Sequence, residues 1–346
     1  MYSSRSSRLA RIGAARWLLA VILSIPGGGI AGDGTGADCN RNGIPDEQDL
    51  RAGDLILQSA RRFPAGDAPV SIAAGDLDGD LDIDLVTANR DSSDVSVLLN
   101  RGDGSFSAPT GFSAGAEPVA VALAGLDADA DLDIAVASRG SEGGGLSVLL
   151  NLGGGAYAPR VPLSGAPTPN SVAAGDIDGD GDVDLVAADD ASGIVALHEN
   201  DGAGGFGDGE SHDLGEEPTS VVVADFDRDG RLDIAALTSH GSPATLAYDA
   251  SILFNEGEGT FAEPLHFGAA ESPHSMIATD VDGDSNPDLV ISDQSNSPFI
   301  EHVVILENIG HRGPSLDRLA HRPVKGPPTS SDGPSAPRRD LSVGAP

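Results

Sequence analysis

Residues 176–184, DIDGDGDVD, place a carboxylate at every second position, and a short apolar run, residues 185–188, follows them. Related nonapeptides begin at Asp76 (DLDGDLDID), Gly125 (GLDADADLD), Asp225 (DFDRDGRLD) and Asp280 (DVDGDSNPD). Successive copies are 49, 51, 49 and 55 residues apart. A period of this size is typical of a fold built from repeated supersecondary units.

Short apolar segments flank each acidic copy. Residues 221–224 precede the fourth copy and residues 185–188 follow the third, and both are rich in small or β-branched residues. Such runs favour β-strands, so each nonapeptide is expected to be the loop of a β-hairpin. A second shared element lies further along each unit. It is an apolar strand ending in Asn, a Gly-rich turn and an aromatic residue, as in residues 97–106 and 252–261.

One unit therefore contains four short strands and no amphipathic helix, which predicts an all-β fold, a β-propeller of four-stranded antiparallel blades. Five copies predict five blades. Residues 57–64 align with residues 106–113 and so correspond to a fourth strand, whereas the last copy ends after its third strand, at residues 302–308. Pairing the first segment with the last blade would close the ring and remove both sheet edges.

These units resemble FG-GAP/VCBS repeats, the blades of integrin-α-type propellers and of many secreted bacterial proteins. The resemblance covers residues 55–310 and rests on D-x-D-x-D-G-x-x-D followed by Leu or Ile, and on L-x-N-x-G-x-G-x-F. It implies calcium in the hairpin loops, held by side chains at positions 1, 3, 5 and 9 and by the main-chain carbonyl at position 7. Members of the family more often close with seven blades, so a partial seven-bladed ring stays open beside a five-bladed one.

The charge pattern points to the same ion. Acidic residues outnumber basic ones 54 to 20, giving a net charge of -34. Two carboxylates about 4 Å apart repel by about 1 kcal/mol in water and by about 4 kcal/mol at an effective dielectric constant of about 20. Calcium, which takes about six to eight oxygen ligands, removes this repulsion. Solvated acidic turns without an ion are the alternative. The negative charge disfavours nucleic acids and anionic lipids as partners.

The copies differ in how completely they match the family pattern. The third and fourth match fully, the fifth has Ser285 where Gly is usual, and the first has Leu81, a poor residue for a positive φ. In the second copy Gly125 and Ala130 replace the first carboxylate and the Gly, so whether that loop holds an ion stays open. The calcium ligands that the resemblance implies are Asp76, Asp78, Asp80 and Asp84; Asp127, Asp129 and Asp133; Asp176, Asp178, Asp180 and Asp184; Asp225, Asp227, Asp229 and Asp233; and Asp280, Asp282, Asp284 and Asp288.

A separate loop, residues 38–49, precedes the repeats. It has oxygen donors at positions 1, 3, 5, 9 and 12 and Gly at position 6, the order of an EF-hand loop. It resembles the calcium loops of dockerin-like and thrombospondin-type-3 segments. The ligands would be Asp38, Asn40, Asn42, Asp46 and Asp49. A turn-rich linker is the alternative, and the single cysteine, Cys39, excludes an intrachain disulfide.

The two ends of the chain differ from the repeats. Residues 1–31 have the cationic start, the apolar run of about nine residues and the small-residue cleavage site of a secretory signal peptide. A membrane-spanning helix needs about 20 apolar residues, which favours cleavage over an uncleaved anchor. The expected parts are a signal peptide (1–31), an EF-hand-like loop and linker (32–54), the propeller (55–310) and a disordered, Pro-rich basic tail (311–346).

The predicted function is binding. A secreted or cell-surface protein, extracellular or periplasmic, with structural calcium in its blade loops is expected to be a protein-binding or cell-adhesion module. Its partner would be an extracellular protein or a surface glycan, with no nucleic acid and no stable membrane insertion. The first alternative is a polysaccharide-binding or polysaccharide-degrading protein, although residues 32–346 contain no Trp and two Tyr. The second is a purely structural surface component. No nucleophile–base pair or transition-metal motif is evident, so no enzyme is expected.

Overall fold

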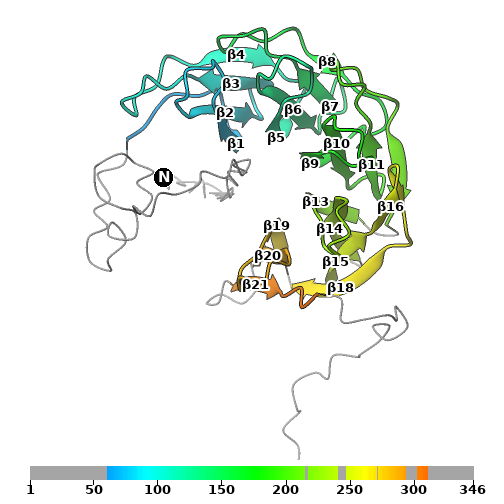
Figure 1. Ribbon diagram of the computed structural model, residues 1–346. Helices are drawn as coiled ribbons and strands as arrows, with labels where there is room; N and C mark the ends of the chain where they lie inside the picture. The colour runs from blue at the N-terminus through cyan, green and yellow to red at the C-terminus, as the bar shows by residue number, and fades with distance from the viewer. Residues whose placement is uncertain (1–60, 215–216, 241–246, 271, 294–301, 311–346) are drawn as a thin grey trace, which may run out of the picture. The chain divides into compact units, whose positions relative to one another are not determined.

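The computed structural model describes residues 61–214, 217–240, 247–270, 272–293 and 302–310. These residues form 21 β-strands and no helix (Figure 1), which confirms the all-β prediction. Accordingly, no helix that could span a membrane occurs in these ranges. The predicted signal peptide, the loop of residues 38–49 and the tail of residues 311–346 lie outside the described residues.

The strands form four antiparallel sheets of four strands, one sheet of three strands and a two-stranded ribbon. We call the five larger sheets blades 1 to 5. Blade 1 consists of β1 (Pro69–Gly75), β2 (Asp84–Asn89), β3 (Asp94–Leu98) and β4 (Thr110–Ser113). Blade 2 consists of β5 (Pro118–Ala124), β6 (Asp133–Ser138), β7 (Gly145–Leu149) and β8 (Val161–Pro162). Blade 3 consists of β9 (Pro169–Gly175), β10 (Asp184–Asp189), β11 (Ile194–His198) and β12 (Glu210–Asp213).

Blade 4 consists of β13 (Glu217–Ala224), β14 (Asp233–His240), β15 (Ala247–Leu253) and β18 (Leu265–Ala270). The ribbon β16 (Asn255–Gly257) and β17 (Thr260–Phe261) lies between its third and fourth strands. Blade 5 consists of β19 (Pro273–Thr279), β20 (Asp288–Asp293) and β21 (His302–Leu306). In every blade the strands are ordered as in the chain, as expected for repeated propeller-like units.

Each acidic nonapeptide joins the first two strands of its blade. The last residue of the first strand pairs with the ninth-position Asp, as Gly75 pairs with Asp84 and Ala224 with Asp233. The Gly-rich turn after the third strand is closed by a bridge between an Asn and an aromatic residue. The bridges are Asn100–Phe106, Asn151–Tyr157 and Asn200–Phe206. The hairpin-loop prediction is confirmed, and both kinds of loop recur at the same point of each unit.

The apolar cores lie between neighbouring blades. Val95 and Val97 of β3 share a cluster with Ile134 and Val136 of β6. Equivalent clusters join blades 2 and 3, 3 and 4, and 4 and 5. The first strands β1, β5, β9, β13 and β19 lie side by side in this order (Figure 1). Burying one large aliphatic side chain stabilises by about 1.5–3 kcal/mol, so each blade depends on its neighbours, as in other repeat proteins.

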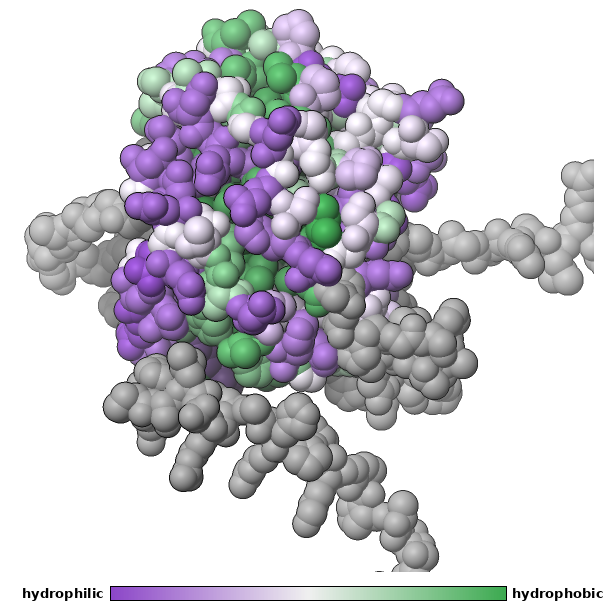
Figure 2. All heavy atoms as spheres, turned by 90° about the vertical axis from the view of Figure 1, so that its right-hand side faces the viewer, coloured by the Kyte–Doolittle hydropathy of each residue, from purple (hydrophilic) through white to green (hydrophobic). Residues whose placement is uncertain are grey.

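Blade 5 has no fourth strand among the described residues. Residues 57–60 of the segment predicted to supply it are outside the described ranges, and residues 61–65 belong to no strand. Ring closure therefore stays a prediction. Figure 2 shows hydrophilic residues over much of the side that carries β11 and β16 in Figure 1, with apolar residues between them.

Candidate metal centres

The first-position carboxylate shapes its acidic loop. Asp76 accepts hydrogen bonds from the N–H groups of Gly79, at 2.8 Å, and Leu81, at 2.9 Å. Asp225 and Asp280 accept two or more main-chain N–H groups of their own loops in the same way. These bonds wrap the loop around the carboxylate and hold it at the loop's centre.

The sixth position has a positive φ in all five loops, whichever residue occupies it. The angles are 73° at Leu81, 70° at Ala130, 100° at Gly181, 90° at Gly230 and 69° at Ser285. A residue with a Cβ is strained there, by roughly 1–2 kcal/mol. Leu81 was expected to be poorly suited to this angle, and the structure shows that it adopts the angle with its side chain 87% exposed. Replacing Gly at the sixth position therefore adds backbone strain but does not change the sign of φ at that position.

Four of the five loops gather three carboxylates each. In these clusters one oxygen of every carboxylate lies within 4.8 Å of the others. Positions 1, 3 and 9 form the cluster in blades 1, 3 and 5, and positions 1, 3 and 5 form it in blade 4. The clusters are Asp76, Asp78 and Asp84; Asp176, Asp178 and Asp184; Asp225, Asp227 and Asp229; and Asp280, Asp282 and Asp288. The predicted ligands Asp80, Asp180, Asp284 and Asp233 do not join these groups.

The second loop differs. Its carboxylates Asp127, Asp129 and Asp133 form no such cluster in the described chain. The fourth position has a positive φ in the other four loops but not at Ala128. Gly125 offers no carboxylate for the loop to wrap around, which accounts for the different backbone. This loop thus lacks the three-carboxylate cluster that the other four loops share.

The clustered carboxylates repel one another. Burial raises the pKa of Asp78, Asp178 and Asp227, and the negative charges of neighbouring aspartates raise it further. Each ionised form is thus disfavoured while no cation is near. A hard divalent cation would remove the penalty, and an all-oxygen donor set suits calcium. The residues present fit the ion that the sequence predicts.

The ninth-position Asp holds the blade together. Oδ2 of Asp184 accepts the N–H of Ile177 at 2.8 Å, and Oδ1 accepts the N–H of Asn200 at 2.9 Å. Burial raises the pKa of Asp184 and Asp233 to about 6. The same pair of bonds is made by Asp84, Asp133, Asp233 and Asp288. Sequence reasoning treated this residue only as a ligand and missed this role.

The Asn after the third strand ties one blade to the blade before it. Nδ2 of Asn151 donates to the carbonyl of Leu132 in its own blade, at 3.1 Å, and to the carbonyl of Leu77 in blade 1, at 2.9 Å. Leu77 is the second residue of an acidic loop. Equivalent bonds run from Asn200 to Leu126, from Asn255 to Ile177 and from Asn308 to Phe226. The recurring L-x-N was visible in the sequence, but its partner, 74 residues away for Asn151, was not.

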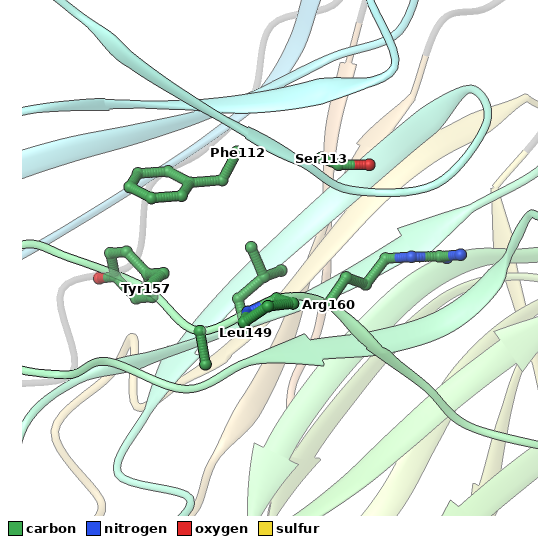
Figure 3. Close-up of a pocket in the computed structure, with 7 residues that line it drawn as sticks. Phe112, Ser113, Leu149, Tyr157 and Arg160 are labelled. Carbon is green, nitrogen blue, oxygen red and sulfur yellow. The ribbon is translucent and has the colours of Figure 1, made fainter.

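A hollow of about 400 Å³ lies at the seam between blades 1 and 2 (Figure 3), lined by Phe112, Ser113, Leu149, Tyr157, Ala158, Pro159 and Arg160. The rings of Phe112 and Tyr157 meet edge to face at 5.2 Å. Tyr157 is 7% exposed, and its hydroxyl donates to the carbonyl of Leu132. Arg160 donates to the carbonyl of Gly143. The ring of Tyr157 therefore presents little face to solvent, whereas the ring of Phe112 is half-buried.

Solved structures with a similar chain path include proteins of different kinds. The V. cholerae biofilm matrix protein Bap1 is 20% identical with a TM-score of 0.43, and the match covers 71% of this chain and 38% of that one. The Tc holotoxin pore of Photorhabdus luminescens is 20% identical with a TM-score of 0.39, covering 73% and 11%. The Aleuria aurantia lectin is 14% identical with a TM-score of 0.39, covering 70% and 81%. The chain thus spans well under half the length of the first two.

Sequence comparison gives a more specific result. No curated protein sequence matches this chain. The model of the FG-GAP-like repeat matches residues 76–136, 125–187 and 176–236. Each match begins at the first position of an acidic loop and ends in the second strand of the next blade. Residues 76–236 of this chain therefore carry three FG-GAP-like repeats.

Proposed function

We propose that this chain is an exported calcium-binding β-propeller whose ions are structural. The observation that carries the proposal is the three-carboxylate cluster, which recurs at the same point of blades 1, 3, 4 and 5. The ions would be held by the three clustered Asp residues of each loop. The fourth Asp of the sequence pattern, which lies outside the cluster, would complete positions 1, 3, 5 and 9 when the ion is bound. When bound, calcium would neutralise the clustered charge and fix the hairpin. The carboxylates themselves orient the loop through their bonds to its N–H groups.

A pair of variants in one loop tests this role. Asp178 belongs to the cluster of blade 3, whereas Asp182, at position 7 of the same loop, has a carboxylate outside it. Both substitutions by Ala remove one negative charge. We expect Asp178→Ala to lower the melting temperature in calcium and to leave it unchanged in excess EGTA, and Asp182→Ala to change neither. Affinities of about 10⁻⁴ to 10⁻³ M are ordinary for extracellular modules.

Thermal unfolding of the full chain and the number of ions bound at equilibrium give the readout. A calcium-dependent rise in melting temperature, with several ions per chain, supports the proposal. An equal loss for Asp178→Ala with and without calcium would instead assign Asp178 a role in the fold alone. No calcium effect on the unaltered chain would contradict the proposal, because the loops would then be solvated turns.

The biological role that we propose is protein binding or cell-surface adhesion. The Asn side chains hold each Gly-rich turn against the acidic loop of the preceding blade, so both loop types form one edge of the sheets. A rigid row of loops is a suitable recognition surface. Its partner would be an extracellular protein or a surface glycan, and the proposed activity is binding rather than catalysis.

Binding to a panel of extracellular matrix proteins and to a glycan array, each in calcium and in EGTA, separates the candidates. Calcium-dependent binding to a protein supports adhesion. Calcium-dependent binding to glycans alone would favour the polysaccharide alternative, and release of sugar fragments from an anionic polysaccharide would show an enzyme. Binding to neither panel would favour a structural surface component.

A further inference from the structure

The hollow between blades 1 and 2 has an apolar end and a charged end. Figure 3 shows the rings of Phe112 and Tyr157 at one end and the guanidinium of Arg160 at the other, with Leu149 between them. Ligand pockets typically have a volume of about 300–1,000 Å³, mostly apolar walls and a few polar groups, and this hollow has a volume of about 400 Å³. It therefore has the size and the lining of a site for a small molecule or a single side chain.

The guanidinium of Arg160 is held in place without being neutralised. Nη1 donates to the carbonyl of Gly143 at 3.1 Å, and the residue is half-buried. Gly115 leaves room for this group, since a Cβ there would lie 2.6 Å from Nη1. Arg160 forms no ion pair with the residues that the structure describes, unlike Arg90 and Arg139. A guanidinium has five N–H donors, so donors remain for an anionic ligand.

The charged end lies away from the acidic loops. Gly143 is in the turn that follows β6, whereas the acidic loop of blade 2 precedes β6. The six residues of β6 span about 20 Å at about 3.3 Å per residue, and charges are largely screened beyond about 8 Å at physiological ionic strength. Glu142, in the same turn as Gly143, is exposed and forms no ion pair with Arg160. The net negative charge of the chain therefore does not prevent an anion from reaching Arg160.

The cation is a departure from the repeat. Arg160 follows Tyr157, the aromatic residue that closes the Gly-rich turn, by three positions. The residues at the same place in the other four-stranded blades are Pro109, Gly209 and Pro264. Three blades thus form without a cation here, so the fold does not require Arg160. An arginine that the fold does not require, beside a hollow of ligand size, favours a role in binding.

We propose that this hollow binds a carboxylic acid whose body is an aromatic ring or a branched aliphatic chain. Arg160 pairs with both carboxylate oxygens, the geometry that suits a planar guanidinium. The apolar body of the ligand lies against Phe112 and Leu149, at the other end of the hollow (Figure 3). The site is separate from the acidic loops, so the inference does not rest on the proposed role of calcium.

The lining favours an apolar acid over a sugar. Its side-chain hydroxyls are those of Ser113 and Tyr157, and the hydroxyl of Tyr157 is already bonded to the carbonyl of Leu132. A sugar brings several hydroxyl groups, and each one that is buried without a partner weakens binding. The acid can be a free small molecule or the C-terminal residue of a peptide, since both present a carboxylate beside an apolar group.

Fluorine NMR of the full chain labelled with 3-fluorotyrosine tests the site, with calcium present. Tyr157→Phe identifies the Tyr157 signal, and Phe is the residue at the equivalent place in other blades, at Phe106, Phe206 and Phe261. The probes are phenylacetate, which is a free acid, acetyl-diglycyl-phenylalanine, which is a peptide acid, and the amide of the same peptide. We expect the Tyr157 signal to shift with the concentration of an acid and the other tyrosine signals to stay unchanged.

Variants test the two ends of the hollow separately. Arg160→Gln is expected to weaken binding of an acid at least about tenfold, since hydrogen bonds to charged groups are the stronger ones. Arg90→Gln removes a cation from the equivalent edge of blade 1 and is the control, expected to change binding less than about twofold because a distant charge is screened. Phe112→Leu is expected to weaken binding several-fold, and its counterpart in blade 2, Leu163, shows that the repeat accepts Leu at this place.

A shift that needs the free carboxylate and weakens in Arg160→Gln, at an unchanged melting temperature, supports the proposal. A response to the peptide acid alone also supports it and identifies a protein C-terminus as the source, whereas a response to phenylacetate alone supports it and identifies a free acid. Equal binding of the amide, or equal affinity of Arg160→Gln and the parent, would overturn recognition of the carboxylate. No shift with either acid at tens of millimolar would overturn the site.

Discussion

The main-chain N–H of Asn151 donates a 2.7 Å hydrogen bond to Oδ1 of Asp133, across two different loops of blade 2. Oδ2 of Asp133 accepts the N–H of Leu126 at 2.6 Å, and the residue is fully buried. Asp133 does this in the one acidic loop that gathers no three-carboxylate cluster in the described chain. The ninth-position Asp therefore stabilises the fold through main-chain hydrogen bonds that do not require a metal.

Asp133→Ala is expected to destabilise the protein equally in calcium and in EGTA. The substitution leaves two buried main-chain N–H groups without an acceptor, at about 1–3 kcal/mol each. Urea unfolding with and without the chelator measures the loss. Asp127→Ala, which removes another carboxylate of the same loop, is the matched control and is expected to cost little. A loss for Asp133→Ala that appears only in calcium would contradict this account.

Leu81→Gly is expected to stabilise the protein by about 1 kcal/mol. Leu81 has a φ of 73° and an exposed side chain, so Gly relieves backbone strain without removing apolar packing. The gain is smaller than the full strain because Gly also has more freedom in the unfolded chain. Thermal unfolding gives the comparison. Ile83→Gly, at an exposed position of the same segment without a positive φ, is the control and should not stabilise.

His198→Leu is expected to raise the free energy of unfolding by about 1–2 kcal/mol at pH 7. His198 is fully buried, and among the described residues neither ring nitrogen has a hydrogen-bond partner of good geometry. The main chain of Gly207 interacts with the ring too weakly to offset the effect of burial, and such burial is costly for a polar group. Its counterparts in the other blades are Leu98, Leu149, Leu253 and Leu306. His266→Leu is the control, because His266 is exposed and bonds to Ser251. A destabilised His198→Leu protein would show that the imidazole has a partner that the leucine cannot replace.

The advantage of His198→Leu is expected to grow as the pH falls. Burial lowers the pKa of His198 to about 4, from an ordinary value of 6.5. The unfolded chain therefore binds a proton that the folded chain excludes between these values. Above about pH 6.5 His198 is neutral in both states, and its protonation does not affect the free energy of unfolding. As the pH falls from 6.5 toward 4, the parent protein loses stability relative to the variant, by a total on the order of 3 kcal/mol.

Urea unfolding of both proteins at several pH values gives this difference. Comparing the variant with the parent cancels the opposite effect of the buried aspartates. An advantage that does not change with pH would mean that His198 takes up a proton in the folded chain as readily as in the unfolded chain.

Much of the fold could be predicted because its information is local. The alternating carboxylates and their apolar flanks lie within one hairpin, and five repetitions of the pattern define the blades. The hydrogen bonds by which an Asn side chain links one blade to the preceding blade could not be predicted in this way. Asn151 and Leu77 are 74 residues apart, and only the packing of one blade on the next brings them together.

The candidate sites were predictable to a similar extent. Spacing placed the first and third carboxylates side by side, as in Asp176 and Asp178. It could not show that Asp180 lies outside its cluster whereas Asp229, at the same position of the next loop, lies inside its own. Both residues accept the N–H of the residue two positions later, so the repeated carboxylate pattern and this local bond are the same in the two loops, and only the three-dimensional course of each loop separates them.

The hydrogen bond from an Asn side chain to the preceding blade also bears on how the number of repeats can change in evolution. Each of these bonds needs only an Asn side chain in one repeat and a main-chain carbonyl in its neighbour. A carbonyl is present whatever the residue, and the acceptors here are Leu77, Leu126, Ile177 and Phe226. A duplicated or deleted unit would therefore meet the same donor and acceptor at its new borders. Gain or loss of whole repeats by recombination would thus preserve the Asn–carbonyl bond between neighbouring blades without compensating substitutions.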